Sequence, residues 1–376
     1  MTDVVQLLHS AFSPLEQTIS KHKPQFIALH FQEVGGKDYM VNMGQAENFF
    51  CNIESSEEMK DFDRVSIYID NEFQSEDTFT ALGSMYFIHK TLKNIYQYDF
   101  NVKDLKAVQG KNKHVGSLDR VATVEKEKFP KNFWPDVSMY GGVCGERYGR
   151  STHGGVDLVN IHLFHDASNL IACNSSPSVY SGNRKNALRY VINSRFTALP
   201  FFLFGDFNFR LDTLSVVEHL SIETEMQTVK KDSTNEVEKI ICEEKDSTHQ
   251  LVLHIEEKLF EYLHEAFFRE DNGKALLKYD KEVQAFCDII REVDITFPPS
   301  YPYSEDHNQP TRYMNTRCPA WCDRILMSHT ADDLIHWSDD DEEEEKSVVY
   351  NTVGPNVCMG DHKPVFLFFQ LKTNNH

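Results

Sequence analysis

The residues best suited to chemistry stand in the segment Gly-Asp-Phe-Asn-Phe-Arg at positions 205–210. Asp206 and Asn208 are two residues apart, so on an extended backbone their side chains point to one side, while Phe207 and Phe209 point to the other and into a core. A carboxylate can align or deprotonate an attacking water, and an amide can donate a hydrogen bond to a phosphoryl oxygen. The alternative is a turn after a strand, where Asp and Asn are common because they bond to nearby backbone.

A second group of reactive side chains stands at positions 360–364, in the segment Gly-Asp-His-Lys-Pro. An imidazole needs a partner that fixes its tautomer and raises its basicity, and Asp323 in the segment Trp-Cys-Asp-Arg is the natural candidate for His362. Neighbouring residues on an extended backbone point apart. Asp361 is therefore expected to help hold a metal ion rather than to orient His362.

Two further candidates come from earlier in the chain. Glu33 follows an apolar segment and precedes Gly35 and Gly36, which allow a close backbone approach; it is either a metal ligand or a solvated surface carboxylate. Asn160 and His162 share one face of a predicted strand, and His162 is equally well explained as a phosphate donor or as a core residue. Together these residues offer a cation site, a carboxylate for water and donors for negative charge, which hydrolysis of a phosphate ester needs.

These candidates stand where apolar strands end or begin. Apolar runs predict strands at 26–31, 156–163, 200–204, 321–327 and 365–371. Helical periodicity predicts helices at 4–19, 179–192 and 251–268. The six glycines among residues 141–155 predict a loop. Reactive side chains at strand ends are typical of α/β proteins that assemble one site from distant parts of the chain.

Composition limits the class of protein. The chain has 376 residues, 40% of them hydrophobic, which suits a globular domain with a substantial core. A formal net charge of −20 argues against a general nucleic-acid binder, because such proteins need basic surfaces. No apolar stretch approaches the roughly 20 residues that span a bilayer, and no signal peptide is recognised, so a cytoplasmic protein is expected. The eight cysteines are expected to be reduced, and an acidic loop is expected at 338–346.

The segments above, together with Pro-Ala-Trp-Cys-Asp-Arg-Ile-Leu at 319–326, resemble the inositol polyphosphate 5-phosphatases. These belong to the DNase I-like, or endonuclease/exonuclease/phosphatase, superfamily. The likeness keeps the chain order from about residue 23 to residue 371. The eight-residue block is specific to the 5-phosphatases, whereas the Gly-Asp-x-Asn and Asp-His elements alone indicate only the superfamily. Longer stretches, such as 158–170 and 297–306, are similar to the type I members.

The resemblance implies a four-layer α/β/β/α sandwich of two packed mixed β-sheets, in a single domain over residues 1–376. It implies Mg²⁺ as cofactor and hydrolysis of the 5-phosphate of soluble inositol 1,4,5-trisphosphate and inositol 1,3,4,5-tetrakisphosphate, which ends calcium signalling. Water attacks directly in this family. Glu33 and Asp361 would hold the metal. The catalytic residues that the resemblance implies are His162, Asp206, Asn208, Asp323 and His362.

Substrate-binding residues follow from the same resemblance. Lipid-active members grip a neighbouring phosphate with a Thr-Tyr-Lys-Tyr-like segment and a Lys-x-Arg, where this chain has Ser-Tyr-Pro-Tyr at 300–303 and Asn-Thr-Arg at 315–317. Two lysines are therefore absent, which fits a soluble substrate. The alternative for each single arginine is a surface salt bridge. The candidates are Tyr301 and Arg317, with Arg184, Lys185, Arg324 and Lys363 as further cations.

Three departures from the family pattern keep other functions open. The family begins with a strand that carries an Asn of the metal site, whereas this chain starts at the following helix, so the sandwich is expected to lack its first strand. A Lys-Gly-x-x-Arg strand is replaced by the glycine-rich stretch. The prenylated cysteine tail of type I members, which implies peripheral attachment at the plasma membrane in a longer form, is absent. The alternatives are a catalytically impaired inositol-phosphate-binding fragment and a superfamily nuclease, and the charge of −20 argues against the nuclease.

Overall fold

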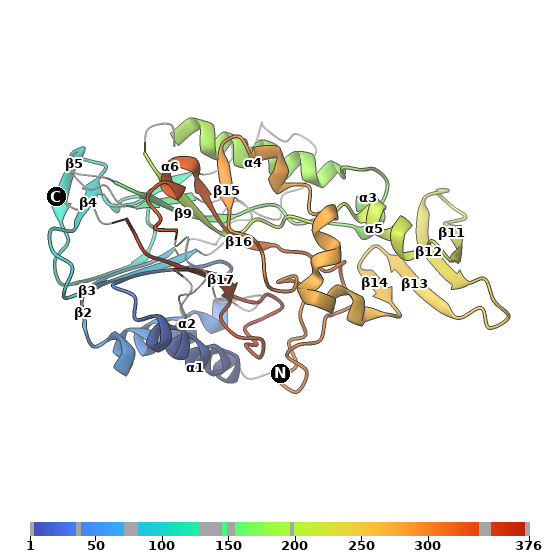
Figure 1. Ribbon diagram of the computed structural model, residues 1–376, viewed down its shortest axis with the longest axis horizontal. Helices are drawn as coiled ribbons and strands as arrows, with labels where there is room; N and C mark the ends of the chain where they lie inside the picture. The colour runs from blue at the N-terminus through green and yellow to red at the C-terminus, as the bar shows by residue number, and fades with distance from the viewer. Residues whose placement is uncertain are drawn as a thin grey trace.

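Two β-sheets lie face to face, with helices on both outer faces (Figure 1). The computed structural model describes residues 4–34, 39–70, 82–127, 145–148, 155–195, 199–337 and 347–372. In spatial order, the first sheet contains β1 (Phe26–Phe31), β3 (Gly83–His89), β2 (Phe62–Asp70) and β6 (Lys111–Gly116). The second contains β15 (Ile290–Glu292), β16 (Asp323–Ser328), β10 (Phe201–Asp206), β9 (Asp157–His162), β8 (Gly145–Tyr148) and β7 (Glu125–Glu127). The predicted four-layer α/β/β/α sandwich is confirmed.

Helices cover the outer face of each sheet because each presents an apolar side to it. α1 (Val4–His22) and α2 (Tyr39–Ser55) lie on the first sheet, and α4 (Val179–Arg195) lies on the second (Figure 1). The buried cluster under α1 and α2 includes Ile19, Phe50, Ile53, Ile67 and Phe87. The cluster under α4 includes Leu188, Val191, Ile161 and Leu203. The helices predicted at 4–19 and 179–192 are confirmed.

Smaller elements surround the sandwich. Two-stranded sheets are formed by β4 (Tyr96–Asp99) with β5 (Asp104–Ala107) and by β17 (Val348–Thr352) with β18 (Val365–Phe369). Short helical segments are α3 (Asn169–Ala172), α5 (Thr213–Leu220), α6 (His329–Asp332), η1 (Glu57–Met59), η4 (Glu265–Phe268), η5 (Glu270–Tyr279) and η6 (Val283–Phe286). None of the helices in the described ranges is both long enough and apolar enough to cross a membrane.

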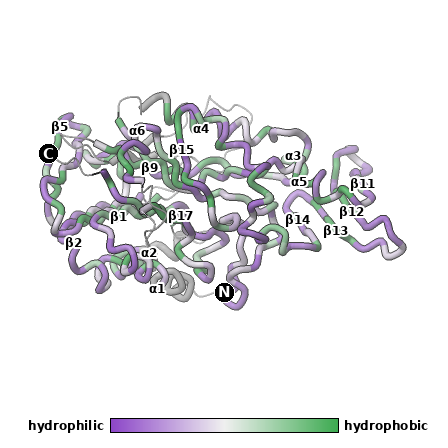
Figure 2. The backbone as a smooth tube through the Cα atoms, viewed as in Figure 1, coloured by the Kyte–Doolittle hydropathy of each residue, from purple (hydrophilic) through white to green (hydrophobic). Residues whose placement is uncertain are grey.

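The prediction of a helix over residues 251–268 is wrong. This segment forms β13 (Leu251–Glu256), β14 (Leu259–Tyr262) and η4, and it continues a meander with β11 (Thr224–Lys230) and β12 (Val237–Glu244). The meander projects from one end of the molecule, and Figure 2 shows hydrophilic residues at its far tip. Spacings of four residues also fit a tight hairpin, in which Ile255 pairs with Phe260. Cross-strand packing against β12 then outweighs local helical preference.

Two other predicted segments lie wholly or partly outside the described residues. The acidic loop at 338–346 lies wholly outside them. Within the glycine-rich stretch 141–155, only residues 145–148 and 155 are described, and residues 145–148 form β8 rather than a loop. Glycine disfavours a strand, but β8 pairs with β7 on one side and with β9 on the other, and these hydrogen bonds stabilise it.

His30 on β1 makes stability depend on pH. Its ring stacks on Phe204 with centroids 4.5 Å apart, and its Nε2 is buried without a hydrogen-bond partner among the residues that the structure describes. Burial lowers the pKa of His30 from 6.5 to about 3. The unfolded chain therefore binds a proton that the folded chain does not, so stability is fully present above pH 6.5 and falls as the pH drops towards 3. Because one proton is taken up on unfolding, we expect a loss of at most about 1.4 kcal/mol per pH unit.

The comparison is with His30→Phe, which keeps an aromatic ring against Phe204 and Tyr86. Urea unfolding at a series of pH values between 7 and about 4.5 measures the free energy of unfolding of both proteins. As the pH falls, the free energy of unfolding of His30→Phe should rise relative to that of the wild type. Parallel pH profiles for the two proteins would contradict the assignment of this dependence to His30.

Candidate active site

Three neighbouring strands of the second sheet bring three reactive side chains into one row. In the parallel pairing of β9 with β10, His162 is the partner of Asp206. In the antiparallel pairing of β10 with β16, Asp323 is the partner of Asp206 on the other side. Paired strands lie about 4.8 Å apart, so the three side chains stand close together at one edge of the sandwich.

The turn after β10 fixes the carboxylate of Asp206. Gly205 has φ +143°, and a Cβ at this position would lie 1.9 Å from the carbonyl oxygen of Ile161, so only glycine fits. The backbone N–H of Asn208 donates to Asp206 Oδ1 at 2.7 Å, and Asn208 Nδ2 donates to Asp206 Oδ2 at 3.0 Å. Both oxygens of the buried Asp206 are thus oriented by one residue.

Asn208 has no free donor for a substrate. Its Nδ2 group donates to Asp206 and, at 2.9 Å, to the carbonyl oxygen of Leu163. Its Oδ1 accepts from Arg210 Nη2 at 2.7 Å, which fixes the orientation of the amide because arginine can only donate. The expectation that this amide donates to a phosphoryl oxygen is therefore not met here. Asn208 instead positions Asp206.

His362 lies shortly before β18 (Val365–Phe369), and its side chain is bonded to the predicted partner, Asp323. Its Nδ1 lies 2.9 Å from Asp323 Oδ2, and the same oxygen accepts from Ser300 Oγ at 2.7 Å. Burial opposes charge on the ring, but Asp323 and Asp206 outweigh it and keep the pKa of His362 well above its usual value. Nε2 faces the other carboxylates, 3.9 Å from Asp206 and 4.0 Å from Asp361. A charged His362 therefore directs a donor into the site.

Glu33 reaches the same edge from the first sheet. It follows β1 with φ +50°, and its side chain is 57% exposed. Its Oε1 lies 3.6 Å from His162 Nε2, which is 3.5 Å from Asp206 Oδ2. Because these distances are ion-pair contacts rather than short hydrogen bonds, His162 Nε2 remains available to a ligand, while its buried Nδ1 has no hydrogen-bond partner in the described part of the chain.

The donor set fits a divalent cation. Ligand atoms of Asp206, Asp323 and His362 lie within 4.8 Å of one another. Asp323 Oδ2, however, already accepts from Ser300 and His362. The carboxylates that remain for a cation are those of Asp206, Glu33 and Asp361, and oxygen ligands of this kind suit Mg²⁺ or Ca²⁺ with water completing the shell.

Comparisons with known proteins decide the family. Residues 2–368 match the model of the Endonuclease/Exonuclease/phosphatase family 2. The chain is 52% identical over 360 residues to Inositol polyphosphate-5-phosphatase A of Canis lupus familiaris, covering 94% of this chain and 86% of that protein. The chain belongs to the inositol polyphosphate 5-phosphatases. As a member of this family it is a phosphoric monoester hydrolase.

Two further similarities accompany this assignment. The 5-phosphatase is 32% identical over 385 residues to the Caenorhabditis elegans protein named Probable type I inositol 1,4,5-trisphosphate 5-phosphatase, covering 93% of this chain and 91% of that protein. A solved structure of the inositol polyphosphate 5-phosphatase domain of SPsynaptojanin, in complex with inositol (1,4)-bisphosphate and calcium ion, is similar at TM-score 0.46 and 14% identity. That likeness covers 91% of this chain and 74% of the solved chain.

Two arginines predicted to bind substrate are structural in this 5-phosphatase. Arg184 is fully buried and pairs with Asp166 and, at 2.6 Å, with Glu282. Glu282 also accepts from the backbone N–H of Arg210 at 3.0 Å, so Arg184 supports the turn after β10. Sequence alone could not show the two carboxylates that surround it.

Arg324 is likewise 1% exposed and pairs with Asp280 at 2.6 Å and with Glu292 at 2.8 Å. Lys363 is 2% exposed and donates to the carbonyl oxygens of Val357 and Pro310, the latter at 2.6 Å. Both predictions of substrate contact are therefore corrected, because these charges are already satisfied inside the protein. Lys185, beside Arg184 on α4, stays a prediction.

Tyr301 lies against His362, and Arg317 lies near Tyr301 and Arg210, while contact of either residue with a substrate stays a prediction. The ring of Tyr301 lies 4.5 Å from that of His362, centroid to centroid. Arg317 is partly exposed and donates to the carbonyl oxygens of Asp166 and Ala167 at 3.3 and 3.4 Å, and no carboxylate within the described ranges pairs with it. Burial lowers the pKa of Arg317, and the nearby charge of Arg210 acts in the same direction.

Sequence reasoning missed Arg210 and Ser300. Arg210 is 6% exposed, donates to Asn208 and lies over the ring of Tyr301, 4.4 Å from its centroid. It therefore connects the turn after β10 with the Tyr301 segment. Ser300 is fully buried and supports Asp323. Both stood inside segments already recognised, but only the folded contacts show what they do.

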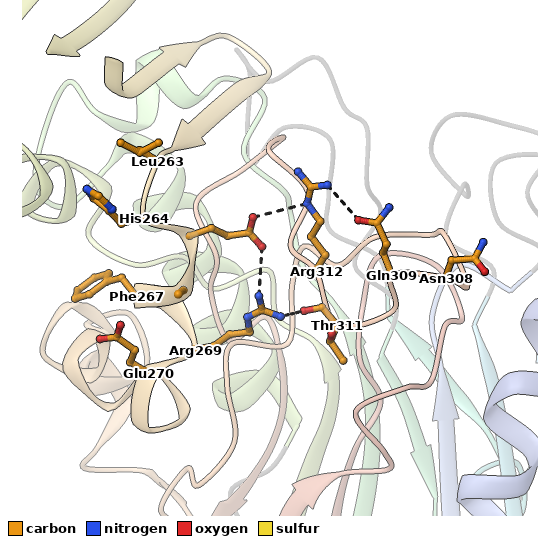
Figure 3. Close-up of a pocket in the computed structure, with 11 residues that line it drawn as sticks. Leu263, His264, Phe267, Arg269, Glu270, Asn308, Gln309, Thr311 and Arg312 are labelled. Carbon is orange, nitrogen blue, oxygen red and sulfur yellow. Dashed lines mark hydrogen bonds and ion pairs between the residues drawn. The ribbon is translucent and has the colours of Figure 1, made fainter. Parts of the chain in front are cut away.

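Two hollows of the surface are lined mainly by residues outside this site. One of about 730 Å³ lies between η4 and the loop at 308–312 (Figure 3). Its cations are already paired, since Arg269 and Arg312 both lie within 4 Å of Glu265. A second, of about 550 Å³, is lined in part by Arg317 and Pro319 and thus borders the predicted substrate side.

Proposed function

We propose that this chain removes the 5-phosphate of soluble inositol 1,4,5-trisphosphate and inositol 1,3,4,5-tetrakisphosphate in a Mg²⁺-dependent reaction. Such an activity would end a calcium signal in the cytoplasm. The observation that supports it best is the row of His162, Asp206 and Asp323, with His362 bonded to Asp323. We further propose that residues 1–376 form one catalytic domain.

In the proposed reaction, Asp206 aligns or deprotonates the attacking water. The two hydrogen bonds from Asn208 keep its carboxylate in one orientation, which suits a base that must face the attacking water. The neighbouring Cys322 is fully buried and burial raises the pKa of its thiol, so it stays protonated and does not compete as a nucleophile. Direct attack by water follows, without a covalent enzyme intermediate.

Charge on the phosphate is proposed to meet donors from two sides. His362 Nε2 donates from one side, and its charge is maintained by Asp323. His162 Nε2 donates from the side of Glu33. A divalent cation bound by Glu33 and Asp361 beside Asp206 would neutralise phosphoryl oxygens. Tyr301 and Arg317 are proposed to bind a second phosphate of the substrate.

Phosphate release from inositol 1,4,5-trisphosphate tests the proposal. We expect turnover with Mg²⁺ and its loss when a chelator removes the metal. Inositol 1,4-bisphosphate, which lacks the 5-phosphate, should release none and is the matched control substrate. Calorimetric binding of the trisphosphate without turnover would instead identify an impaired binding protein, and nicking of plasmid DNA would identify a nuclease.

A further inference from the structure

Asn160, in the middle of the sandwich, joins the two sheets. It lies on β9 of the second sheet and is fully buried. Its Nδ2 donates to the carbonyl oxygens of Phe31 and Gly83 at 3.2 and 3.0 Å and approaches Ser84 Oγ at 3.3 Å. All three partners belong to β1 or β3 of the first sheet. A buried amide that donates across to the opposite sheet fixes how the two sheets sit on each other.

The remaining atom of this amide holds the residue before Glu33. Asn160 Oδ1 accepts from Gln32 Nε2 at 2.6 Å. The carbonyl partners of Nδ2 leave Oδ1 as the acceptor, so the direction of this bond is settled. Gly205 makes room for it, because a Cβ there would lie 3.1 Å from Gln32 Nε2. The side chain of Gln32 is thus held by Asn160 of β9 and lies against Gly205 of β10.

Glu33 needs such an anchor. Its left-handed backbone conformation, φ +50°, costs about 1–2 kcal/mol in a residue other than glycine. Its own side chain is mostly exposed, so packing does not hold it. On one side Val34 is buried in the core under α1 and α2, and on the other Gln32 is bonded to Asn160. Two anchors on either side therefore determine where the carboxylate points.

We propose that Gln32 and Asn160 are positioning residues that hold the Glu33 carboxylate against His162 and Asp206 and so set the affinity of the site for a divalent cation. This rests on the proposed function only in assigning Glu33 to the metal. Asn160 and His162 are two residues apart on one face of β9. Asn160, which bonds to Gln32, and His162, which contacts Glu33, therefore keep a fixed position relative to each other. The second sheet thereby determines the position of a ligand carried by the first.

Gln32→Met is the sharpest test, because it removes one hydrogen bond at the end of a strand and keeps the length of the side chain. Calorimetric titration with Mg²⁺ alone should show about tenfold weaker binding, the lower end of what loss of a supporting residue costs. The Mg²⁺ concentration for half-maximal phosphate release should rise by a similar factor, while kcat at saturating Mg²⁺ stays within about twofold. Thermal unfolding should remain close to wild type.

Ser84→Ala is the matched control. It removes the 3.3 Å contacts of Ser84 Oγ with Asn160 Nδ2 and His30 Nδ1 and leaves the bond of Asn160 to Gln32 in place, so its Mg²⁺ affinity should equal that of the wild type. Unchanged Mg²⁺ affinity in Gln32→Met would overturn the proposal. If the wild type binds Mg²⁺ but releases no phosphate, the proposed function fails while the binding comparison still decides the role of Gln32. A wild type that does not bind Mg²⁺ would refute both.

Discussion

Asp206→Asn should lower kcat for inositol 1,4,5-trisphosphate by about a thousandfold, within the range expected for loss of a general base. The substitution keeps the shape of the side chain and removes its charge. Asp206 Oδ2 lies 3.5 Å from His162 Nε2 and 3.9 Å from His362 Nε2, and both oxygens accept from Asn208. An amide at this place would point its own N–H₂ group at the N–H donors of Asn208. It would also leave the two histidines without their shared carboxylate.

Single-turnover phosphate release at saturating Mg²⁺ measures this loss directly, separate from substrate binding. Asp246→Asn is the matched control, because it makes the same chemical change in an exposed group whose hydrogen bonds come from the neighbouring residues Thr248 and His249. It should leave kcat unchanged. Thermal unfolding of both variants checks that the fold is intact. A folded Asp206→Asn protein that keeps more than a tenth of the wild-type rate would remove Asp206 from the role of base.

Much of this site could be predicted because strand signals are strong. The apolar runs at 26–31, 200–204 and 365–371 correspond to β1, β10 and β18. The partnership of Asp323 with His362 was predicted from the need of an imidazole for a carboxylate, and it is confirmed at 2.9 Å. The register was not predictable, because a shift of pairing between β9 and β10 changes which residue stands beside Asp206 without changing any local pattern.

Burial is what sequence reasoning judged least well. Arg184 and Arg324 are as polar in sequence as Arg317, yet each is enclosed with two carboxylates, whereas Arg317 keeps an exposed edge. Asn208 was expected to face the substrate, and instead Arg210 and Leu163 use its amide. In each case the decisive partner is distant in sequence or reached only through the folded turn. The residue type determines what chemistry a side chain can perform, and its partners in the fold determine whether that side chain is available to a ligand.

His362→Gln should also cause a large loss, about a hundredfold or more in kcat, since it removes a charged donor from the developing charge of the phosphate. Asp323→Asn should reproduce most of this loss, because an amide no longer maintains the charge of His362, whose Nδ1 bond to Asp323 orients Nε2 towards Asp206. Ser300→Ala should cost less, because it removes the two hydrogen bonds that Ser300 Oγ makes with Oδ2 and the backbone N–H of Asp323 but leaves the pair of Asp323 and His362 intact. Steady-state kinetics with saturating Mg²⁺ measures all three.

The double variant decides whether Asp323 acts through His362. If it does, adding Asp323→Asn to His362→Gln should change kcat by no more than about threefold, because residues that work as a unit are strongly non-additive. Independent roles, for example Asp323 as a direct metal ligand, would instead multiply the two losses and weaken Mg²⁺ binding in Asp323→Asn alone. The ligand atoms of Asp206, Asp323 and His362 are close enough for either role. Action through His362 is favoured, because Asp323 Oδ2 already accepts from Ser300 and His362, and a carboxylate oxygen with two such donors is a poor ligand for a cation.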